Sequence, residues 1–188
     1  MLLKTFLPAL FLLFFAVGEP EVDKAAAREA YALLNNIRTN PKSYAAEIGA
    51  FLNKQHALKA LTWNDTLAKV AEAKAIDMAK NNYFSHVDKK GYGINYLIDK
   101  AGYKLNKEFL KHKKDNFFES IALGYSGPHE AIKDLLIDSS DPGLNHRKHL
   151  LSQDKFHAKD TDIGIGFVRS ATDKGDITYI SIIIARHN

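Results

Sequence analysis

The sequence contains no cysteine among its 188 residues. Disulfide bonds therefore cannot stabilise the fold, and stability has to come from a packed hydrophobic core, which a chain of this length can form. A large excess of one charge is also lacking, because 26 basic residues against 22 acidic ones give a net charge of +4. So small a surplus over the whole chain does not predict nucleic-acid binding.

Long apolar runs are confined to the N-terminus. Lys4 precedes an apolar run over residues 6–17, which is shorter than the roughly 20 residues that a membrane-spanning helix needs. A basic start, an apolar middle and small residues at the end are typical of a secretory signal peptide. We therefore predict that residues 1–18 are a signal peptide and that the protein is exported, either secreted or periplasmic. An exported chain without cysteine is more typical of bacteria than of animals.

Repeats, low-complexity tracts and linkers are absent from residues 19–188. We therefore expect one domain there. Beyond the predicted signal peptide, the sequence has no further candidate for a transmembrane segment. The mature protein is therefore expected to have none.

The pattern of apolar residues predicts helices first and strands last. Helices are expected at residues 23–38, from Pro41 to about residue 52, and from residue 64 or 65 to about residue 80, with Asn40 and then Asn64 or Asp65 as caps. Shorter helices are expected at residues 94–101, 129–139 and 145–151, the last capped by Asn145. Strands are expected at residues 117–123, 162–169 and 177–186, the last two joined by a hairpin. This order predicts an α+β fold, drawn as a three-layer α/β/α sandwich with a small, largely antiparallel sheet between helices.

Five stretches occur in an order that is typical of one protein family. They are Leu61-Thr62-Trp63-Asn64, Tyr83-Phe84-Ser85-His86, Glu119-Ser120-Ile121-Ala122-Leu123-Gly124, His146-Arg147-Lys148-His149-Leu150-Leu151 and Ile163-Gly164-Ile165-Gly166. Together they resemble the CAP superfamily of cysteine-rich secretory, antigen-five and plant pathogenesis-related proteins, also called the SCP domain, in its cysteine-free bacterial type. The resemblance covers residues 27–185, nearly the whole predicted domain.

The resemblance implies that two histidines and two acidic residues from separate segments meet at the floor of a surface cleft. His86 and His146 match the two histidines of the family, and Glu119 matches the first acidic residue. Asp138 stands where members often carry a glutamate, so the acidic side chain is one methylene shorter here. Phe118 precedes Glu119 where the family usually has an asparagine.

These four residue types suit a divalent transition metal. A carboxylate on one ring nitrogen fixes the tautomer of a histidine and leaves the other nitrogen for a metal or a proton. Zinc binds imidazole nitrogen together with carboxylate oxygen and can keep an open position for water or a ligand. We therefore expect zinc or another divalent metal at His86 and His146, with Glu119 and Asp138 as acidic partners, and no organic cofactor.

Other catalytic motifs are incomplete in this sequence. His129-Glu130 resembles the start of a zinc-protease helix, but Lys133 stands where the second histidine should be. Ser120 follows Glu119 in a predicted strand, where neighbours point to opposite faces and cannot act as a nucleophile–base pair. The glycines of residues 163–166 lie in a predicted strand and precede no helix, so they indicate close backbone packing and no nucleotide site.

One local charge bias is present, formed by Lys104, Lys107, Lys111, Lys113 and Lys114. A solvated loop is the simpler interpretation of such a run. The other interpretation is contact with anionic lipid headgroups or acidic glycans at the rim of the cleft.

Three functions are compatible with these observations. The leading hypothesis is a non-catalytic binding module whose cleft or adjacent apolar groove takes a small lipid, a sterol-like molecule or a peptide, with metal at the histidines modulating binding. The second is a metal-dependent hydrolase of peptidase or esterase type, with Glu119 as general base and Arg147 or Lys148 as stabilising groups if they turn inward. The third is an envelope or host-interaction protein in which the four residues are purely structural.

Overall fold

The structure is a computed structural model that describes residues 18–173 and 175–187. Residues 1–17, which make up nearly all of the predicted signal peptide, lie outside the described residues. Lys174 in the predicted hairpin also lies outside them. Within the described ranges, none of the helices combines the length and the apolar character needed to cross a bilayer.

A mostly antiparallel sheet of five strands lies at the centre of the described chain. Its order is β1-β4-β5-β3, and β2 pairs in parallel with β4. The strands are β1 Glu21–Val22, β2 Thr62–Trp63, β3 Glu119–Leu123, β4 Asp162–Thr172 and β5 Gly175–Ala185. β4 continues past its predicted end at residue 169, and β5 begins before its predicted start at residue 177, because their pairing continues to Thr172↔Gly175.

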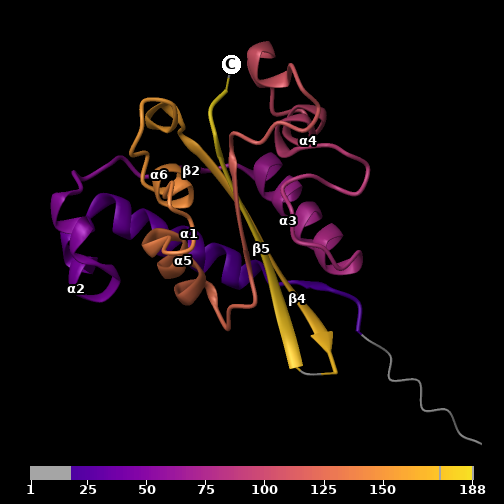
Figure 1. Cartoon of the computed structure of the whole chain (residues 1–188), viewed down its shortest axis with the longest axis horizontal. Helices are drawn as coiled ribbons and strands as arrows, with labels where there is room; N and C mark the ends of the chain where they lie inside the picture. Colours follow the sequence, from indigo (N-terminus) through magenta and orange to yellow (C-terminus); the bar gives the residue numbers. More distant parts are fainter. Residues whose placement is uncertain (1–17, 174, 188) are drawn as a thin grey trace, which may run out of the picture.

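Helices cover both faces of this sheet, as predicted (Figure 1). One face carries α1 Lys24–Thr39, α2 Ala45–Ile48, α5 Pro128–Ile137 and α6 Asn145–Leu150, and the other carries α3 Asp65–Lys80 and α4 Ile94–Lys100. Short 3-10 helices are η1 Pro41–Tyr44, η2 Ala50–Lys54, η3 Lys107–Leu110 and η4 His157–Lys159. The three-layer α/β/α sandwich is therefore confirmed.

Alternation along β5 explains how the sheet joins the two helical layers. Ile180, Ile182 and Ile184 belong to the core cluster under α1 and α5. Tyr179 and Ile183 belong to the clusters under α3 and α4. Because successive strand residues point to opposite faces, a strand with a nearly continuous apolar run supplies both cores.

The glycines of β4 allow α3 to lie directly on the sheet. A Cβ atom at Gly164 would come within 2.1 Å of the Ala68 nitrogen, and one at Gly166 within 2.3 Å of the Ala71 carbonyl carbon. No residue with a side chain fits such approaches without moving the helix backbone. The predicted role of these glycines in close packing is confirmed.

The predicted caps differ in how well they match. The Asn64 side chain accepts hydrogen bonds from the nitrogens of Thr66 and Leu67 and caps α3, as expected. Asn40 occupies the cap position of η1, but its side chain makes no capping bond there. The expected second helix is also divided into η1, α2 and η2 around Gly49.

Asn145 is not the cap of α6, which corrects a prediction. It is the first residue of that helix, and Leu144 precedes it in a left-handed conformation with φ of 52°. The free N–H groups at the helix start are satisfied by carboxylates instead, because Asp141 accepts from the Asn145 nitrogen and Asp138 from the Arg147 nitrogen. Capping by residues of the preceding loop fixes α6 relative to the end of α5.

Candidate functional site

A cleft lies between α6, the end of α5, β3 and the loop that follows α3. It consists of two hollows with volumes of about 630 and 610 Å³, and both are lined by His86 and His146. Glu119 lines the first hollow and Asp138 lines the second. The structure therefore brings all four predicted site residues to one place, which we call the histidine cleft.

His86 is oriented by Glu119. Its Nδ1 atom lies 2.9 Å from Oε2 of Glu119, and the other carboxylate oxygen, Oε1, accepts a 2.6 Å hydrogen bond from the Ser181 hydroxyl. The Glu119 side chain is fully buried, whereas the His86 side chain is 36% exposed. Asn116 holds the backbone of Glu119 through two hydrogen bonds. The carboxylate is thus fixed from several sides, and the imidazole is the part that meets solvent.

His146 is oriented in the same way by Asp138. Its Nδ1 atom lies 2.8 Å from Oδ1 of Asp138, and Oδ2 accepts from the Arg147 nitrogen at 3.1 Å. Asp138 ends α5 in a left-handed conformation with φ of 52°, which aspartate adopts more readily than most residues. The shorter acidic side chain therefore reaches its histidine because the backbone turns toward it.

The two pairs offer the same chemistry from different elements. Each buried carboxylate accepts the Nδ1–H of its histidine, which leaves the Nε2 lone pair for a metal or a proton. His86 comes from the loop after α3, and His146 comes from α6. The cleft thus presents two imidazoles whose tautomers are set by partners beneath them.

A third acidic residue, Asp141, joins this site. In the described part of the chain, the one group of three side chains with ligand atoms all within 4.8 Å comprises Asp138, Asp141 and His146. His86 and Glu119 lie outside that group. One imidazole and two carboxylates are ligand types that zinc accepts, so the donor set fits a divalent metal. Both carboxylates also accept backbone N–H groups, which accounts for their positions without a metal.

Sequence reasoning missed Asp141, although a signal for it was present. Hydrogen bonds from the nitrogens of Asn145 and Gly143 lower the pKa of its carboxyl group. An aspartate followed by proline, glycine and then a short helix is a turn sequence in which such bonds are expected. We interpreted residues 139–144 only as a loop between two helices, and a loop by itself does not indicate a site.

Sequence reasoning also missed His149, which lines the deep end of the same cleft. Its Nδ1 atom lies 2.8 Å from the Ser120 hydroxyl, and its Nε2 atom lies 3.4 Å from the Ile184 carbonyl oxygen. Burial, with a smaller contribution from nearby His157, lowers the pKa of His149 to about 3. His149 is therefore neutral, and it closes the floor of the cleft together with a serine that is 1% exposed.

A further histidine held by a carboxylate stands beside this buried pair. The Nδ1 atom of His157 lies 2.8 Å from Oδ2 of Asp154, and the ring centres of His157 and His149 are 5.1 Å apart. His157 lines the cleft along with His86 and His146. The spacing of Asp154 and His157, three residues apart in one turn, was the signal in the sequence.

Arg147 does not turn into the cleft. Its Nε atom donates a 2.6 Å hydrogen bond to the Leu136 carbonyl oxygen, and its guanidinium carbon lies 3.9 Å from the centre of the Phe51 ring. Lys148 is not among the residues that line the two hollows. Arg147 therefore does not turn inward, as it would have to do to stabilise a reacting group in the cleft.

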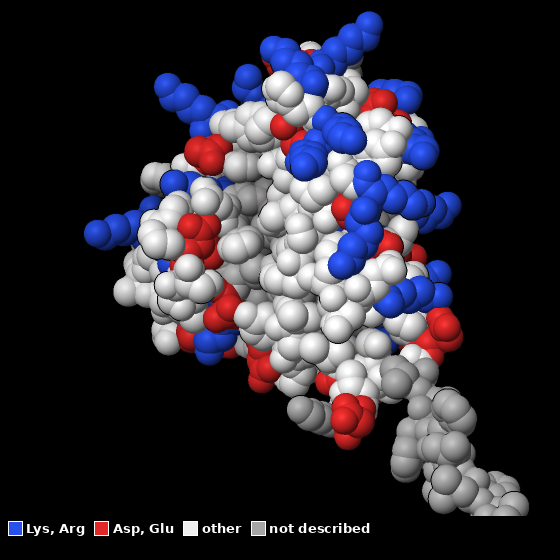
Figure 2. Space-filling view, turned by 45° about the vertical axis from the view of Figure 1, so that its right-hand side comes forward, with Lys and Arg blue, Asp and Glu red and all other residues white. Residues whose placement is uncertain are grey.

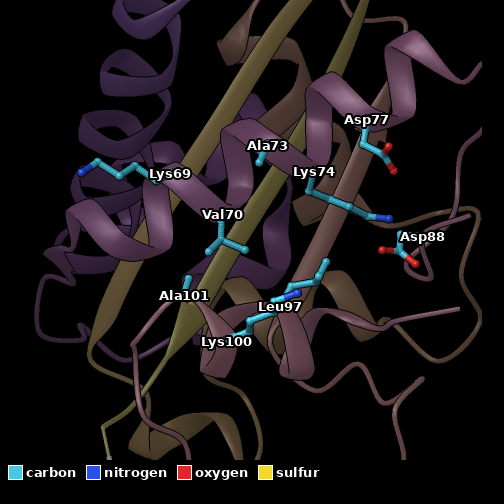
Figure 3. A pocket seen from close by; sticks show the side chains of 9 residues that line it. All are labelled: Lys69, Val70, Ala73, Lys74, Asp77, Asp88, Leu97, Lys100 and Ala101. Atoms are coloured by element: carbon cyan, nitrogen blue, oxygen red, sulfur yellow. The ribbon is translucent and has the colours of Figure 1, made fainter. Parts of the chain in front are cut away.

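A separate cavity of about 400 Å³ lies between α3 and α4, and we call it the α3–α4 pocket (Figure 3). Val70 and Ala73 form one wall, and Leu97 and Ala101 form the other. Lys74 extends along it toward the side of Asp88 (Figure 3). None of the four predicted cleft residues lines this pocket.

Lys74 connects this pocket electrostatically to the histidine cleft. The side chain is 2% exposed, and its ammonium group donates a 3.1 Å hydrogen bond to the Tyr83 hydroxyl. Burial lowers the pKa of Lys74, and the carboxylates of Glu119, Asp77 and Asp88 oppose that effect. A buried cation near Glu119 offsets part of the negative charge beneath His86.

Comparisons with known proteins agree with this fold. A family model described as the cysteine-rich secretory protein family, CAP, matches residues 31–183. An uncharacterized membrane protein, YlbC, of Bacillus subtilis is 30% identical over 81% of this chain and 38% of its own length. An uncharacterized protein, YkwD, of the same organism is 31% identical over 63% of this chain and 39% of its own length. The chain thus spans about two fifths of these curated relatives.

Solved structures show the same architecture. An outer surface protein of Borrelia burgdorferi has a TM-score of 0.55 at 20% identity, over 88% of this chain and 98% of that one. An extracellular protein of Bacillus anthracis that contains an SCP domain has a TM-score of 0.54 at 22% identity, over 86% of this chain and 41% of that one. At these identities the likeness supports the fold alone.

Proposed function

The chain belongs to the cysteine-rich secretory protein family, CAP, and we propose that it is an exported binding module whose histidine cleft holds a divalent metal and a ligand with an apolar part. Its solved neighbours include an outer surface protein and an extracellular protein, which supports export. A lipid, a sterol-like molecule or a peptide has the required apolar part.

The observation that carries the metal part of the proposal is the pairing of each histidine with a buried carboxylate. His86 and His146 are 36% and 26% exposed, whereas the carboxylate side chains of Glu119 and Asp138 are at most 1% exposed. Outer-shell carboxylates of this kind orient an imidazole and raise its strength as a ligand. Asp141 adds a carboxylate near His146. We propose His146 and Asp141 as zinc ligands, joined from the other wall by His86, whose ring lies outside their 4.8 Å group and has to approach them when the metal binds.

Exposed aromatic side chains support the apolar part of the ligand. Among the residues that the structure describes, the large apolar side chains that stay exposed are Phe84 at 46% and Phe117 at 42%. Both line the histidine cleft. Exposed apolar groups gathered at a concave site are typical of ligand binding.

A hydrolase is less well supported by the geometry. Both carboxylate oxygens of Glu119 are already engaged, by His86 and by Ser181, and the side chain is buried. A general base has to reach the proton that it removes, and Glu119 faces its partners instead. Arg147 is turned to backbone carbonyl oxygens, so it adds no stabilising charge to the cleft.

A purely structural role for the four residues fits one pair better than the other. Asp138 also caps α6, so its position has a structural reason. His86 has no such reason: about a third of its side chain is exposed, and its imidazole lines both hollows. An envelope or host-interaction protein with purely structural cleft residues would therefore not explain the orientation of His86.

The proposal is tested by zinc titration of protein purified without a histidine tag. We expect about one zinc ion per chain, and a loss of at least about 10-fold in affinity in His146→Ala and in His86→Ala. His56→Ala is the matched control, because His56 is exposed and lies outside the cleft. Zinc binding that is unchanged in both cleft variants contradicts the metal site.

Ligand binding is tested on the same variants with an environment-sensitive apolar dye. We expect dye fluorescence to rise with the wild-type protein and to rise less with Phe84→Ala. A fluorescence increase that is the same in both proteins contradicts an apolar ligand at this cleft. Hydrolysis of a peptide or an ester that requires both histidines would support the hydrolase instead.

A further inference from the structure

Two chain segments, residues 83–93 and 111–119, run side by side at the mouth of the histidine cleft. The bond between His86 and Glu119 joins them at one end. At the other end, the Gly93 nitrogen donates a 2.7 Å hydrogen bond to the Lys113 carbonyl oxygen. A Cβ atom at Gly93 would lie 2.3 Å from the Asp115 carbonyl oxygen, so glycine is required for this approach.

The pairing of these segments gathers lysines that are separated in the sequence. The exposed lysines are Lys89 and Lys90 on the first segment and Lys111, Lys113 and Lys114 on the second. A Cβ atom at Gly91, on the first segment, would lie 3.8 Å from the ammonium nitrogen of Lys113 on the second. Figure 2 shows basic side chains gathered in the upper part of the face that it presents.

These lysines keep their charge available. In the described part of the chain, none of the five forms an ion pair within 4.0 Å. The nearby carboxylate of Asp88 accepts hydrogen bonds from the nitrogens of Lys90 and Tyr92. That of Asp115 accepts from the His112 nitrogen. The acidic groups are thus engaged with the backbone. The ammonium groups of Lys89 and Lys113 lie 5.1 and 5.7 Å from the ring centres of Tyr83 and Tyr92, contacts that leave their charge unneutralised.

An exposed aromatic ring lies on each segment next to the lysines. Phe84 and Phe117 each stand two residues before a cleft residue, His86 and Glu119 respectively. The Phe117 ring centre lies 6.0 Å from that of Phe109 and 5.9 Å from that of Phe156. A ring with packed neighbours beneath it stays exposed without collapsing onto the surface. We call the two rings and the five lysines the basic-aromatic rim.

We propose that the basic-aromatic rim docks onto a bilayer that contains anionic phospholipid, with the mouth of the histidine cleft toward the membrane. Each lysine near an anionic bilayer tightens binding about fivefold. Aromatic rings are favoured at the boundary between headgroups and acyl chains. A soluble acidic polymer would use the lysines alone and would make no contact with the exposed rings. Docking in this orientation does not depend on metal in the cleft.

Co-sedimentation of the purified protein with vesicles tests this proposal. We expect binding to vesicles of phosphatidylglycerol and phosphatidylcholine to be at least about 10-fold tighter than to phosphatidylcholine alone. Binding is expected to weaken as salt is raised, because salt screens the attraction. Equal binding to the two kinds of vesicle would overturn the proposal.

Charge-reversed variants identify the surface that binds. Lys90→Glu combined with Lys114→Glu is expected to weaken binding to anionic vesicles at least about 10-fold. Lys42→Glu combined with Lys54→Glu changes the net charge equally on exposed lysines of η1 and η2. This control pair is expected to bind nearly as the wild type does, and equal losses in both double variants would overturn the assignment to the rim.

The aromatic part of the rim and the alternative partner have their own tests. Phe84→Ala is expected to reduce the binding to anionic vesicles that persists at high salt. Tight binding to soluble polyphosphate without binding to anionic vesicles would overturn the proposal in favour of an acidic polymer. His86→Ala is expected to lose zinc and keep vesicle binding, so failure of the metal site and failure of membrane docking can be told apart.

Discussion

The solvent-facing part of the histidine cleft and its buried floor use the same residue type in opposite ways. His86 and His146 each contact a buried carboxylate through Nδ1 and keep a quarter to a third of their side chains exposed. His149 contacts a serine hydroxyl, is buried, and has its pKa lowered to about 3. The first two present a free ring nitrogen to solvent, and the third contributes to the core.

The difference shows that partner and exposure decide what a histidine does. A carboxylate beneath an exposed ring favours metal or proton chemistry at the outer nitrogen. A neutral hydroxyl beside a buried ring favours only the uncharged form. His149 lies three residues after His146 on the same short helix, so one turn of α6 separates the two roles.

The largest expected effect is acid destabilisation through His149. Its folded pKa of about 3 lies below the unfolded value of 6.5, so the unfolded chain binds the proton more readily. The stability from this group is fully present above pH 6.5 and is lost as the pH falls toward 3, by on the order of 4 kcal/mol. Urea unfolding at a series of pH values measures it.

His149→Asn provides the control for that experiment, since asparagine keeps a polar partner for Ser120 and does not titrate. Its free energy of unfolding should fall by clearly less than that of the wild type between pH 7 and pH 3. Parallel curves for the two proteins would show that His149 is not the buried, neutral group described above.

The next effect separates the two parts of the cleft at neutral pH. His149→Ala should lower the free energy of unfolding by about 2–4 kcal/mol, because it leaves a cavity and an unpaired Ser120 hydroxyl. His86→Ala should cost less than this, because the ring is partly exposed and water from the cleft can replace it as a partner of Glu119. Urea denaturation of both variants compares them directly. A similar loss of unfolding free energy in each would contradict the difference between the solvent-facing part of the cleft and its buried floor.

A third effect concerns the carboxylates under the exposed histidines. If the cleft binds zinc as proposed, Glu119→Gln and Asp138→Asn should each lower zinc affinity about 10- to 100-fold with the fold retained. Competition titration with a zinc chelator measures this affinity. Glu29→Gln is the matched control, because Glu29 is exposed on α1. If both variants bind zinc as tightly as the control, these carboxylates do not contribute to metal binding.

The smallest effect is expected at His157, which stands between the two parts. Its side chain is 18% exposed and its Nδ1 atom contacts Asp154. His157→Ala should cost about 1 kcal/mol, the typical contribution of one hydrogen bond of this kind. Thermal unfolding is sufficient to measure it. A loss as large as that of His149→Ala would show that His157 contributes to the buried floor of the cleft as His149 does.

Local sequence patterns predicted most of the fold. The boundaries of α1, α3 and α4 follow from apolar periodicity and from Asn64 as a cap, since these signals act between residues close in the chain. The division of the second helix at Gly49 and the capping of α6 by Asp138 and Asp141 were not predicted. Both depend on where a loop folds back, which periodicity does not report.

The predicted site residues came from family motifs, whereas two of the unpredicted contacts, those of His149 and Lys74, come from packing across the fold. Ser120 and His149 meet because β3 packs against α6, although 29 residues separate them. Lys74 lies near Glu119 because α3 packs on the sheet next to β3 and β5. No spacing rule along the chain brings such residues together, because each pair comes from different elements.

The sequence by itself determined the absence of disulfide bonds, the order of helices and strands, the close packing at Gly164 and Gly166, and the two histidines worth examining. These features depend on residue type and on local spacing. Only the tertiary structure decided which histidines face solvent, which carboxylate oxygens are already engaged, and that lysines from two segments share one rim. Burial and partnership arise when distant segments pack, and those quantities set the chemistry of a side chain.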